Sequence, residues 1–263
     1  MDQRSALCVP LRGRRDPAFL IFGSIHSMYN AGSTGIRIII PIAIGAGGVI
    51  AMSSIAFLLD AGSIPLWTIS RHEVVNFTFT MQMMVLPISF VAIALAYLYD
   101  RAGFKAFFRL GIKWSENNDW NVFGPIIAAA FTLGNAIFMA FSLTGYSASI
   151  NNEFYNLIPL VLLLALTNAW SEEIFSRFVI VAGLAGKIGS STICWISAII
   201  FGLPHFFGTP SGFFGVIMSG LLGWLLAKSV LETKGLGWAL FIHFLQDVVI
   251  FGAGALSLAA DLQ

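Results

Sequence analysis

Charged side chains are scarce in this sequence. Asp, Glu, Lys and Arg make up 10 % of its 263 residues, whereas soluble domains usually carry about 25 %. Apolar types make up 57 %, and the mean hydropathy is +0.85. This combination excludes a soluble enzyme, a disordered chain and a nucleic-acid-binding protein with a basic face. It indicates a polytopic membrane protein surrounded by a lipid bilayer.

Cysteine is also scarce, with two residues in the chain, Cys8 and Cys194. The first lies in a basic tail and the second in an apolar run, without the paired spacing of a metal knuckle. The sequence therefore predicts neither a disulfide framework nor a cysteine-based metal site.

Long apolar runs, in contrast, are abundant. Seven segments reach the length of about 20 residues that crosses a hydrocarbon core, or come close to it. They are residues 38–59, 79–98, 122–143, 157 to about 186, about 192–207, about 213–227 and about 236–260. A shorter stretch, residues 17–25, lies in the interface, re-enters the membrane, or forms an eighth helix with its neighbours. We expect an all-α fold, a single domain over residues 1–263, built as a bundle of seven or eight transmembrane helices with a polar cavity inside.

Basic residues are nearly absent from one side of this arrangement. When the seven segments alternate, 12 of the 14 Lys and Arg residues fall on the side of the N-terminal tail, residues 1–37. Arg71 lies on the opposite side and Arg177 inside the membrane. Because cytoplasmic loops carry the excess of Lys and Arg, we predict a plasma-membrane protein with a cytoplasmic N-terminus and an external C-terminus.

The ionisable residues inside the predicted spans all follow residue 157. A charge at the centre of a span costs about 2.5–3.5 kcal/mol on insertion scales, so such residues normally face a bundle interior or a wet cavity. The set comprises Glu172, Glu173, Arg177, His205, His243 and Asp247. Since they fall in three of the last four spans, we expect one shared site.

The first cluster of polar residues runs from Trp170 to Arg177. Successive residues of a helix turn by about 100°, so Glu173 and Arg177 share a face and can form an ion pair. Glu172 lies about 140° from Arg177 and is left to point toward another partner. The alternative interpretation is an ion-pair network within the helix that only fixes packing.

The second and third clusters have the same spacing of four residues. Phe201 and His205 share a helix face, and Pro204 weakens the helix between them. By itself, a membrane histidine packs or donates a hydrogen bond more often than it catalyses. His243 and Asp247 also share a face. This pair has three alternative interpretations. The aspartate fixes the histidine tautomer, or the two residues bind a metal one turn apart, or they form a self-contained pair.

The spacing also predicts the depth of these residues. The turn near residues 187–190 lies about 16 residues after Glu172 and about 17 before His205, so both lie roughly 24 Å from the tip of this hairpin. His243 is only about 8 residues into its own span. Either the hairpin projects beyond the inner boundary, or the last helix starts deeper.

In this order, the three clusters resemble the CAAX protease and bacteriocin-processing family, also called CPBP or Abi. Its patterns are E-E-x-x-x-R, F-x-x-x-H and H-x-x-x-N or a near variant. Here they read Glu172-Glu173-x-x-x-Arg177, Phe201-x-x-x-His205 and His243-x-x-x-Asp247. The resemblance covers about residues 157–250. It implies an intramembrane endopeptidase that acts on a peptide or membrane-protein substrate.

The resemblance also implies roles for the residues. Glu172 and His205 activate water, and His243 and Asp247 polarise the scissile carbonyl and stabilise the oxyanion. Glu173, Arg177 and Phe201 provide structural support. The family has been described both as metal-dependent and as using a metal-free glutamate mechanism. The candidate ligands for Zn²⁺ are Glu172, His205, His243 and Asp247.

Asp247 departs from the asparagine that is more common in the family. An amide can donate a hydrogen bond to an oxyanion, whereas a carboxylate cannot unless it is protonated. The departure therefore favours a metal-binding or histidine-orienting role for Asp247.

Two other functions remain open at the level of sequence. The same polar core could bind a partner in a non-proteolytic immunity or scaffold protein, or it could form the proton path of a transporter. No inverted repeat supports the transporter. Neither an oligomeric state nor a particular substrate follows from the residues. Gly215, Ser219 and Gly223 recur every four positions and permit close helix approach, which favours internal packing over a dimerisation face.

Overall fold

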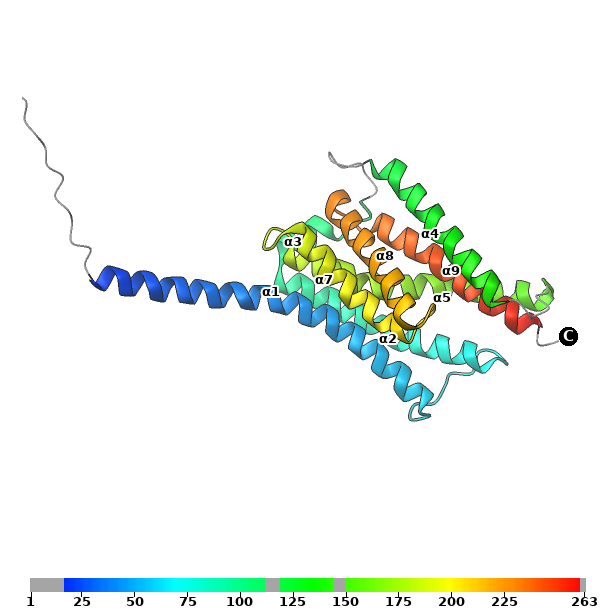
Figure 1. The fold of residues 1–263 in the computed structure, drawn as a ribbon. Coiled ribbons are helices and arrows are strands. Elements are labelled where there is room, and N and C mark those ends of the chain that lie inside the picture. The colour runs from blue at the N-terminus through cyan, green and yellow to red at the C-terminus, as the bar shows by residue number, and fades with distance from the viewer. Residues whose placement is uncertain (1–16, 112–118, 144–149, 261–263) are drawn as a thin grey trace, which may run out of the picture. The chain divides into compact units, whose positions relative to one another are not determined.

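The computed structural model describes residues 17–111, 119–143 and 150–260, with side chains from residue 35 onward. Residues 1–16 of the predicted basic tail, including Cys8, lie outside this part. Every regular element within it is a helix (Figure 1). They are α1 (Pro17–Asp60), α2 (Glu73–Tyr99), α3 (Arg101–Phe107), α4 (Trp120–Ser142), α5 (Asn152–Glu173), η1 (Ile174–Phe178), α6 (Val179–Leu184), α7 (Ser190–Gly202), η2 (Leu203–Phe206), α8 (Gly212–Thr233) and α9 (Gly237–Ala260).

Six helical segments of the described residues are long and apolar enough to cross a membrane. They are Gly35–Asp60, Glu73–Tyr99, Trp120–Ser142, Asn152–Leu184, Gly212–Thr233 and Gly237–Ala260. The chain is therefore an integral membrane protein, and the expected all-α fold is confirmed for the described residues. Residues 17–25 form the first turns of α1 rather than a separate helix.

The predicted fifth span, at about residues 192–207, matches a short apolar helical segment of the structure. The segment Ser190–Phe206 is apolar but shorter than the other spans. Its α-helical part, α7, ends at Gly202, and the 3₁₀ turn η2 follows. Pro204 lies in this turn, and because proline has no backbone N–H to donate, it disfavours continuation of the α-helix.

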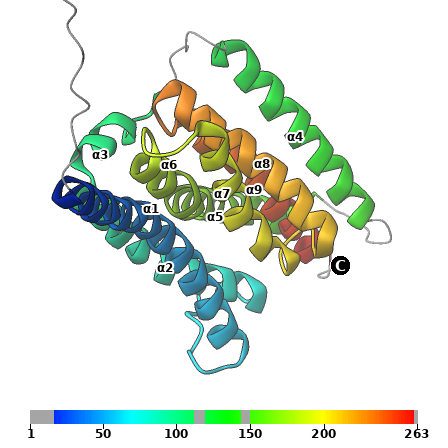
Figure 2. The same ribbon diagram turned by 60° about the vertical axis from the view of Figure 1, so that its left-hand side comes forward.

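By its contacts the chain divides after Arg37, and the site lies in the unit that begins at Ile38. In this unit α5 packs along α9, α4 packs on the other side of α9, and α7 packs along α8 (Figure 2). The segment from Ile174 to Leu184 is buried throughout. Its side chains form much of the apolar core, together with those of α8 and α9.

The small residues of α8 face α7 and η2. A Cβ atom added at Gly223 would lie 3.1 Å from Cδ1 of Phe201, and one added at Gly215 would lie 2.7 Å from the carbonyl oxygen of His205. The prediction of internal packing is confirmed at these two positions. The close approach places both motif residues of the second cluster directly against α8.

Candidate active site

The first cluster lies where the helix geometry changes. Directly after Glu172 and Glu173, the chain forms the five-residue π-helix η1, and all its side chains are buried. π-helical segments are rare and often mark functional sites. A Cβ atom at Gly48 of α1 would lie 2.2 Å from Cδ1 of Phe175, so α1 packs closely against this segment. The constant turn of 100° assumed from the sequence does not hold through η1.

Arg177 is held from two helices. Its Nε lies 3.3 Å from Oε2 of Glu173, and neither side chain is exposed to solvent. The guanidinium carbon lies 3.7 Å from the centre of the Phe201 ring, which is close enough for a cation–π interaction. The predicted Glu173–Arg177 ion pair is confirmed, and Phe201 of α7 adds a second contact to the same cation.

Glu173 has a second partner on α9. Its Oε1 lies 2.7 Å from Nδ1 of His243. Because an ionised carboxylate only accepts hydrogen bonds, Nδ1 carries a proton and donates it to Glu173. Nε2 of His243 then faces Oε2 of Glu172 at 3.5 Å and Oδ2 of Asp247 at 3.7 Å. The carboxylate that accepts from Nδ1 is thus Glu173, whereas one of the alternatives from the sequence gave the orienting role to Asp247.

His205 is oriented by its own backbone. Its Nδ1 lies 2.8 Å from the carbonyl oxygen of Phe201. Since a carbonyl only accepts, Nδ1 donates, and Nε2 of the neutral ring keeps its lone pair. Glu172 interacts electrostatically with this ring, in agreement with the similar depth that the hairpin count predicted.

The Phe201 ring connects the clusters. Its centre lies 4.7 Å from the centre of the His205 ring and 5.3 Å from that of the His243 ring. The guanidinium of Arg177 packs on the same ring. Phe201 therefore contacts the buried cation and both histidines.

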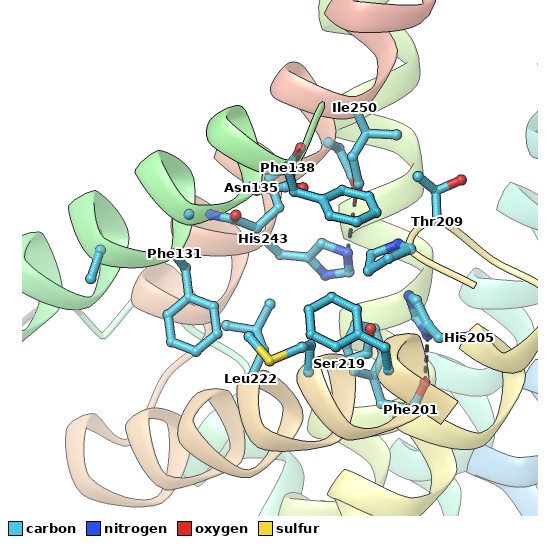
Figure 3. Close-up of a pocket in the computed structure, with 17 residues that line it drawn as sticks. Phe131, Asn135, Phe138, Phe201, His205, Thr209, Ser219, Leu222, His243 and Ile250 are labelled. Atoms are coloured by element: carbon cyan, nitrogen blue, oxygen red, sulfur yellow. Dashed lines mark hydrogen bonds and ion pairs between the residues drawn. The ribbon is translucent and has the colours of Figure 1, made fainter. Parts of the chain in front are cut away.

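Both histidines border a cavity of about 270 Å³ (Figure 3). Its walls come from α4, α7 with η2, the loop after η2, α8 and α9. Most of the lining is apolar, with aromatic side chains such as Phe131, Phe138 and Phe214. The polar lining residues are Asn135, His205, Thr209, Ser219, His243, Gln246 and Asp247. The expected polar intramembrane cavity therefore has an apolar body with a polar edge at His205, His243 and Asp247, whereas Glu172 is not among its lining residues.

Three neutral amides near the site were missed by the search for ionisable residues. Asn168 donates from Nδ2 to Oδ2 of Asp247 at 3.1 Å. Asn135 donates to the carbonyl oxygen of Gln246, whose own amide donates to Thr132. Asn168 precedes Glu172 by one turn and so shares its helix face. Extending the search to amides at this spacing would have found it.

The donor set does not fit a zinc site. Within the described residues, no group of three or more His, Cys, Asp and Glu side chains is arranged to hold a metal ion. The predicted set of Zn²⁺ ligands is therefore not supported, although its four members lie in the same region.

A comparison with models of protein families gave a match to the part of the chain that contains the site. Residues 154–249 match the family model described as Rce1-like, type II CAAX prenyl endopeptidase Rce1-like. This segment includes nearly all of α5, extends well into α9, and contains all three clusters, which confirms the resemblance seen in the motifs. Searches of curated proteins and of solved structures gave no match.

Proposed function

We propose that this protein is an intramembrane endopeptidase in which Glu172 and His205 activate a water molecule. One observation carries the proposal. The Nδ1 atoms of His205 and His243 donate to Phe201 and Glu173 respectively, so these bonds leave both Nε2 atoms free to react, and Nε2 of His243 lies 3.5 Å from Oε2 of Glu172. This is the arrangement that general acid–base chemistry requires.

Glu172 is the proposed general base. Arg177 forms its ion pair with Glu173 and packs on Phe201, so its close contacts are with groups other than Glu172. Its carboxylate accepts a proton from water, with Nε2 of His205 as a second acceptor that orients the same molecule. The oxygen of that water then attacks the scissile carbonyl carbon.

His243 is the proposed donor to the oxyanion. In its protonated form, Nδ1–H donates to Glu173 and Nε2–H is available to the negatively charged oxygen of the tetrahedral intermediate. Three carboxylates surround the ring, which favours the imidazolium. When the C–N bond breaks, the proton held by Glu172 passes to the leaving nitrogen, so hydrolysis is balanced without another reactant.

The topology proposal draws on two contacts between loops. Nζ of Lys187 lies 2.7 Å from Oδ2 of Asp100, and Nε of Arg109 donates to the carbonyl oxygen of Lys234. These contacts bring the basic loops after α2, α6 and α8 to one end of the bundle. We propose that this end is cytoplasmic, as the positive-inside rule requires. An alkaline phosphatase fused after Thr233 should then be inactive.

The decisive experiment replaces Glu172. The purified protein in lipid vesicles is given a quenched-fluorescence peptide ending in a prenylated CAAX sequence, and separately the same peptide without the prenyl group. Glu172→Gln should lower kcat by about 10³-fold while the protein stays folded, because the amide cannot accept the proton. Mass spectrometry of the products identifies the cleaved bond.

The matched control is Glu153→Gln, the same change near the start of α5. Glu153 forms an ion pair with Arg71, and its replacement by Gln should leave kcat unchanged. Full cleavage by Glu172→Gln contradicts the proposal. If a Glu172→Gln, His205→Ala double variant also supported the cellular phenotype, a binding or scaffold role would be favoured instead.

A further inference from the structure

Two polar contacts join α5 to α9 within the site, and they lie one helical turn apart. Glu173 contacts Nδ1 of His243, and Asn168 contacts Oδ2 of Asp247. Asn168 lies one turn before Glu172, and Asp247 lies one turn after His243. The register is therefore that of an antiparallel helix pair, in which the second contact extends the first.

The distances around Asp247 are unequal. Its Oδ2 lies 3.1 Å from the amide nitrogen of Asn168 but 3.7 Å from Nε2 of His243. The first distance is that of a hydrogen bond, and the second is too long for one. The carboxylate of Asp247 is therefore hydrogen-bonded to the neutral amide of Asn168 and not to His243.

This preference matters because Nε2–H of His243 is the proposed oxyanion donor. A carboxylate next to an imidazolium in a region of low dielectric is strongly attracted to it. If Asp247 moved close to Nε2, it would occupy the donor that the tetrahedral intermediate needs. An asparagine at position 247 would carry no charge and would compete far less for the same proton.

We propose that Asn168 is a positioning residue that holds Asp247 away from Nε2 of His243 and so keeps this donor available to the substrate. The inference rests on the proposed peptidase function. It explains how the chain tolerates an acid at position 247: the amide one turn before Glu172 restrains it. The role of Asn168 then depends on the charge at position 247.

That dependence defines the experiment. The wild type, Asn168→Leu, Asp247→Asn and the double variant are assayed in vesicles with the two quenched CAAX peptides. In the Asp247 background, Asn168→Leu should lower kcat by about 10- to 100-fold with little change in KM, as expected when a reacting group is misplaced. In the Asp247→Asn background, the same substitution should lower kcat by less than about threefold.

Asn151→Ala is the matched structural control. Asn151 is the N-cap residue directly before α5 and donates to α9 at the carbonyl oxygen of Ala259, and it does not line the cavity. It should lower thermal stability without changing kcat. If Asn168→Leu does not accumulate, Asn168→Ser replaces it, because the shorter hydroxyl cannot span the same distance.

The outcomes separate this proposal from the one it rests on. Equal losses of kcat in both backgrounds, unchanged kcat in Asn168→Leu, or an inactive Asp247→Asn would each overturn the positioning role. If Glu172→Gln retains full cleavage, or the wild type cleaves neither peptide, both proposals fall. An inactive Glu172→Gln together with a fully active Asn168→Leu removes only the positioning role.

Discussion

The two sides of α5 bury different kinds of polar group. Toward α2, Thr167 donates to Gln82, and Trp170 donates from Nε1 to Ser89 at 3.1 Å. Toward α9, the polar groups are Asn168, Glu172 and Glu173. The neutral side consists of separate pairs between two helices. The ionisable side links α5, η1, α7 and α9 and borders a cavity.

Burial alone does not distinguish these sides. Thr167 and Glu172 are almost equally buried, at 8 % and 9 % exposure. Neutral pairs between membrane helices contribute about 0.6 kcal/mol on average and hold helices together. Ionisable groups cost far more to bury, and their position near a cavity is in line with the proposed catalytic role.

The largest expected effect on stability comes from removing the shared carboxylate of the ionisable side. Glu173→Leu leaves Arg177 fully buried without its ion-pair partner and leaves Nδ1 of His243 without an acceptor. Breaking a buried pair by removing one partner typically costs about 3–5 kcal/mol. The free energy of unfolding, measured by titration with a denaturing detergent, should fall by this amount. A loss below about 1 kcal/mol would show that the network is not needed for the fold.

A smaller loss of stability is expected when a larger side chain on α8 displaces Phe201 of α7. A Cβ atom at Gly223 would lie 3.1 Å from Phe201, and overpacking of this kind costs about 1–3 kcal/mol. Gly223→Val should lower both the unfolding temperature and the rate of peptide cleavage, because Phe201 packs against His205 and His243.

The control for this prediction is Gly47→Ala. No atom lies within 4 Å of a Cβ added there, so the variant should be as stable as the wild type or slightly more stable. If both glycine variants behave alike, the close approach of α8 to α7 is not required.

The neutral side of α5 should tolerate more. Thr167→Val removes a hydroxyl that bonds Gln82 while keeping the shape of the side chain. The free energy of unfolding should fall by about 1 kcal/mol or less, with kcat unchanged. A drop in kcat comparable to that of Asn168→Leu would erase the functional difference between the two sides.

The smallest effect concerns a charged contact outside the membrane. Partial burial tends to raise the pKa of Asp100, but hydrogen bonds from the Gly103 amide and Lys187 outweigh it and hold this pKa below its usual value of 3.8. The contribution to stability is complete above that value and is lost as the pH falls through the lower, folded-state pKa.

For such a partly exposed pair the loss of stability should be below about 1 kcal/mol. The unfolding temperature of the wild type should fall more between pH 6 and pH 3 than that of Asp100→Asn. Equal decreases of the unfolding temperature in the two proteins would contradict the lowered pKa of Asp100.

Sequence periodicity located most of the helices but misjudged their ends. We predicted the second span to begin at residue 79, whereas α2 begins at Glu73. The extra turns include the polar residues Glu73, Asn76 and Thr78. The prediction was based on an apolar run, so it did not extend to them. Asn76 accepts hydrogen bonds from the backbone of Ile69 and Ser70, and Thr80 accepts one from Trp67. These contacts join the first turns of α2 to the preceding loop.

The sequence by itself determined that the protein lies in a membrane, which residues are ionisable at depth, and that Glu173 and Arg177 pair. Each of these depends on composition or on neighbours one helical turn apart. Only the tertiary structure showed that Glu173 contacts His243 across 70 residues, that Asn168 donates to Asp247, and that Phe201 packs against Arg177 and both histidines. Such contacts depend on how α5, α7 and α9 pack, and helical periodicity carries no information about the register between separate helices.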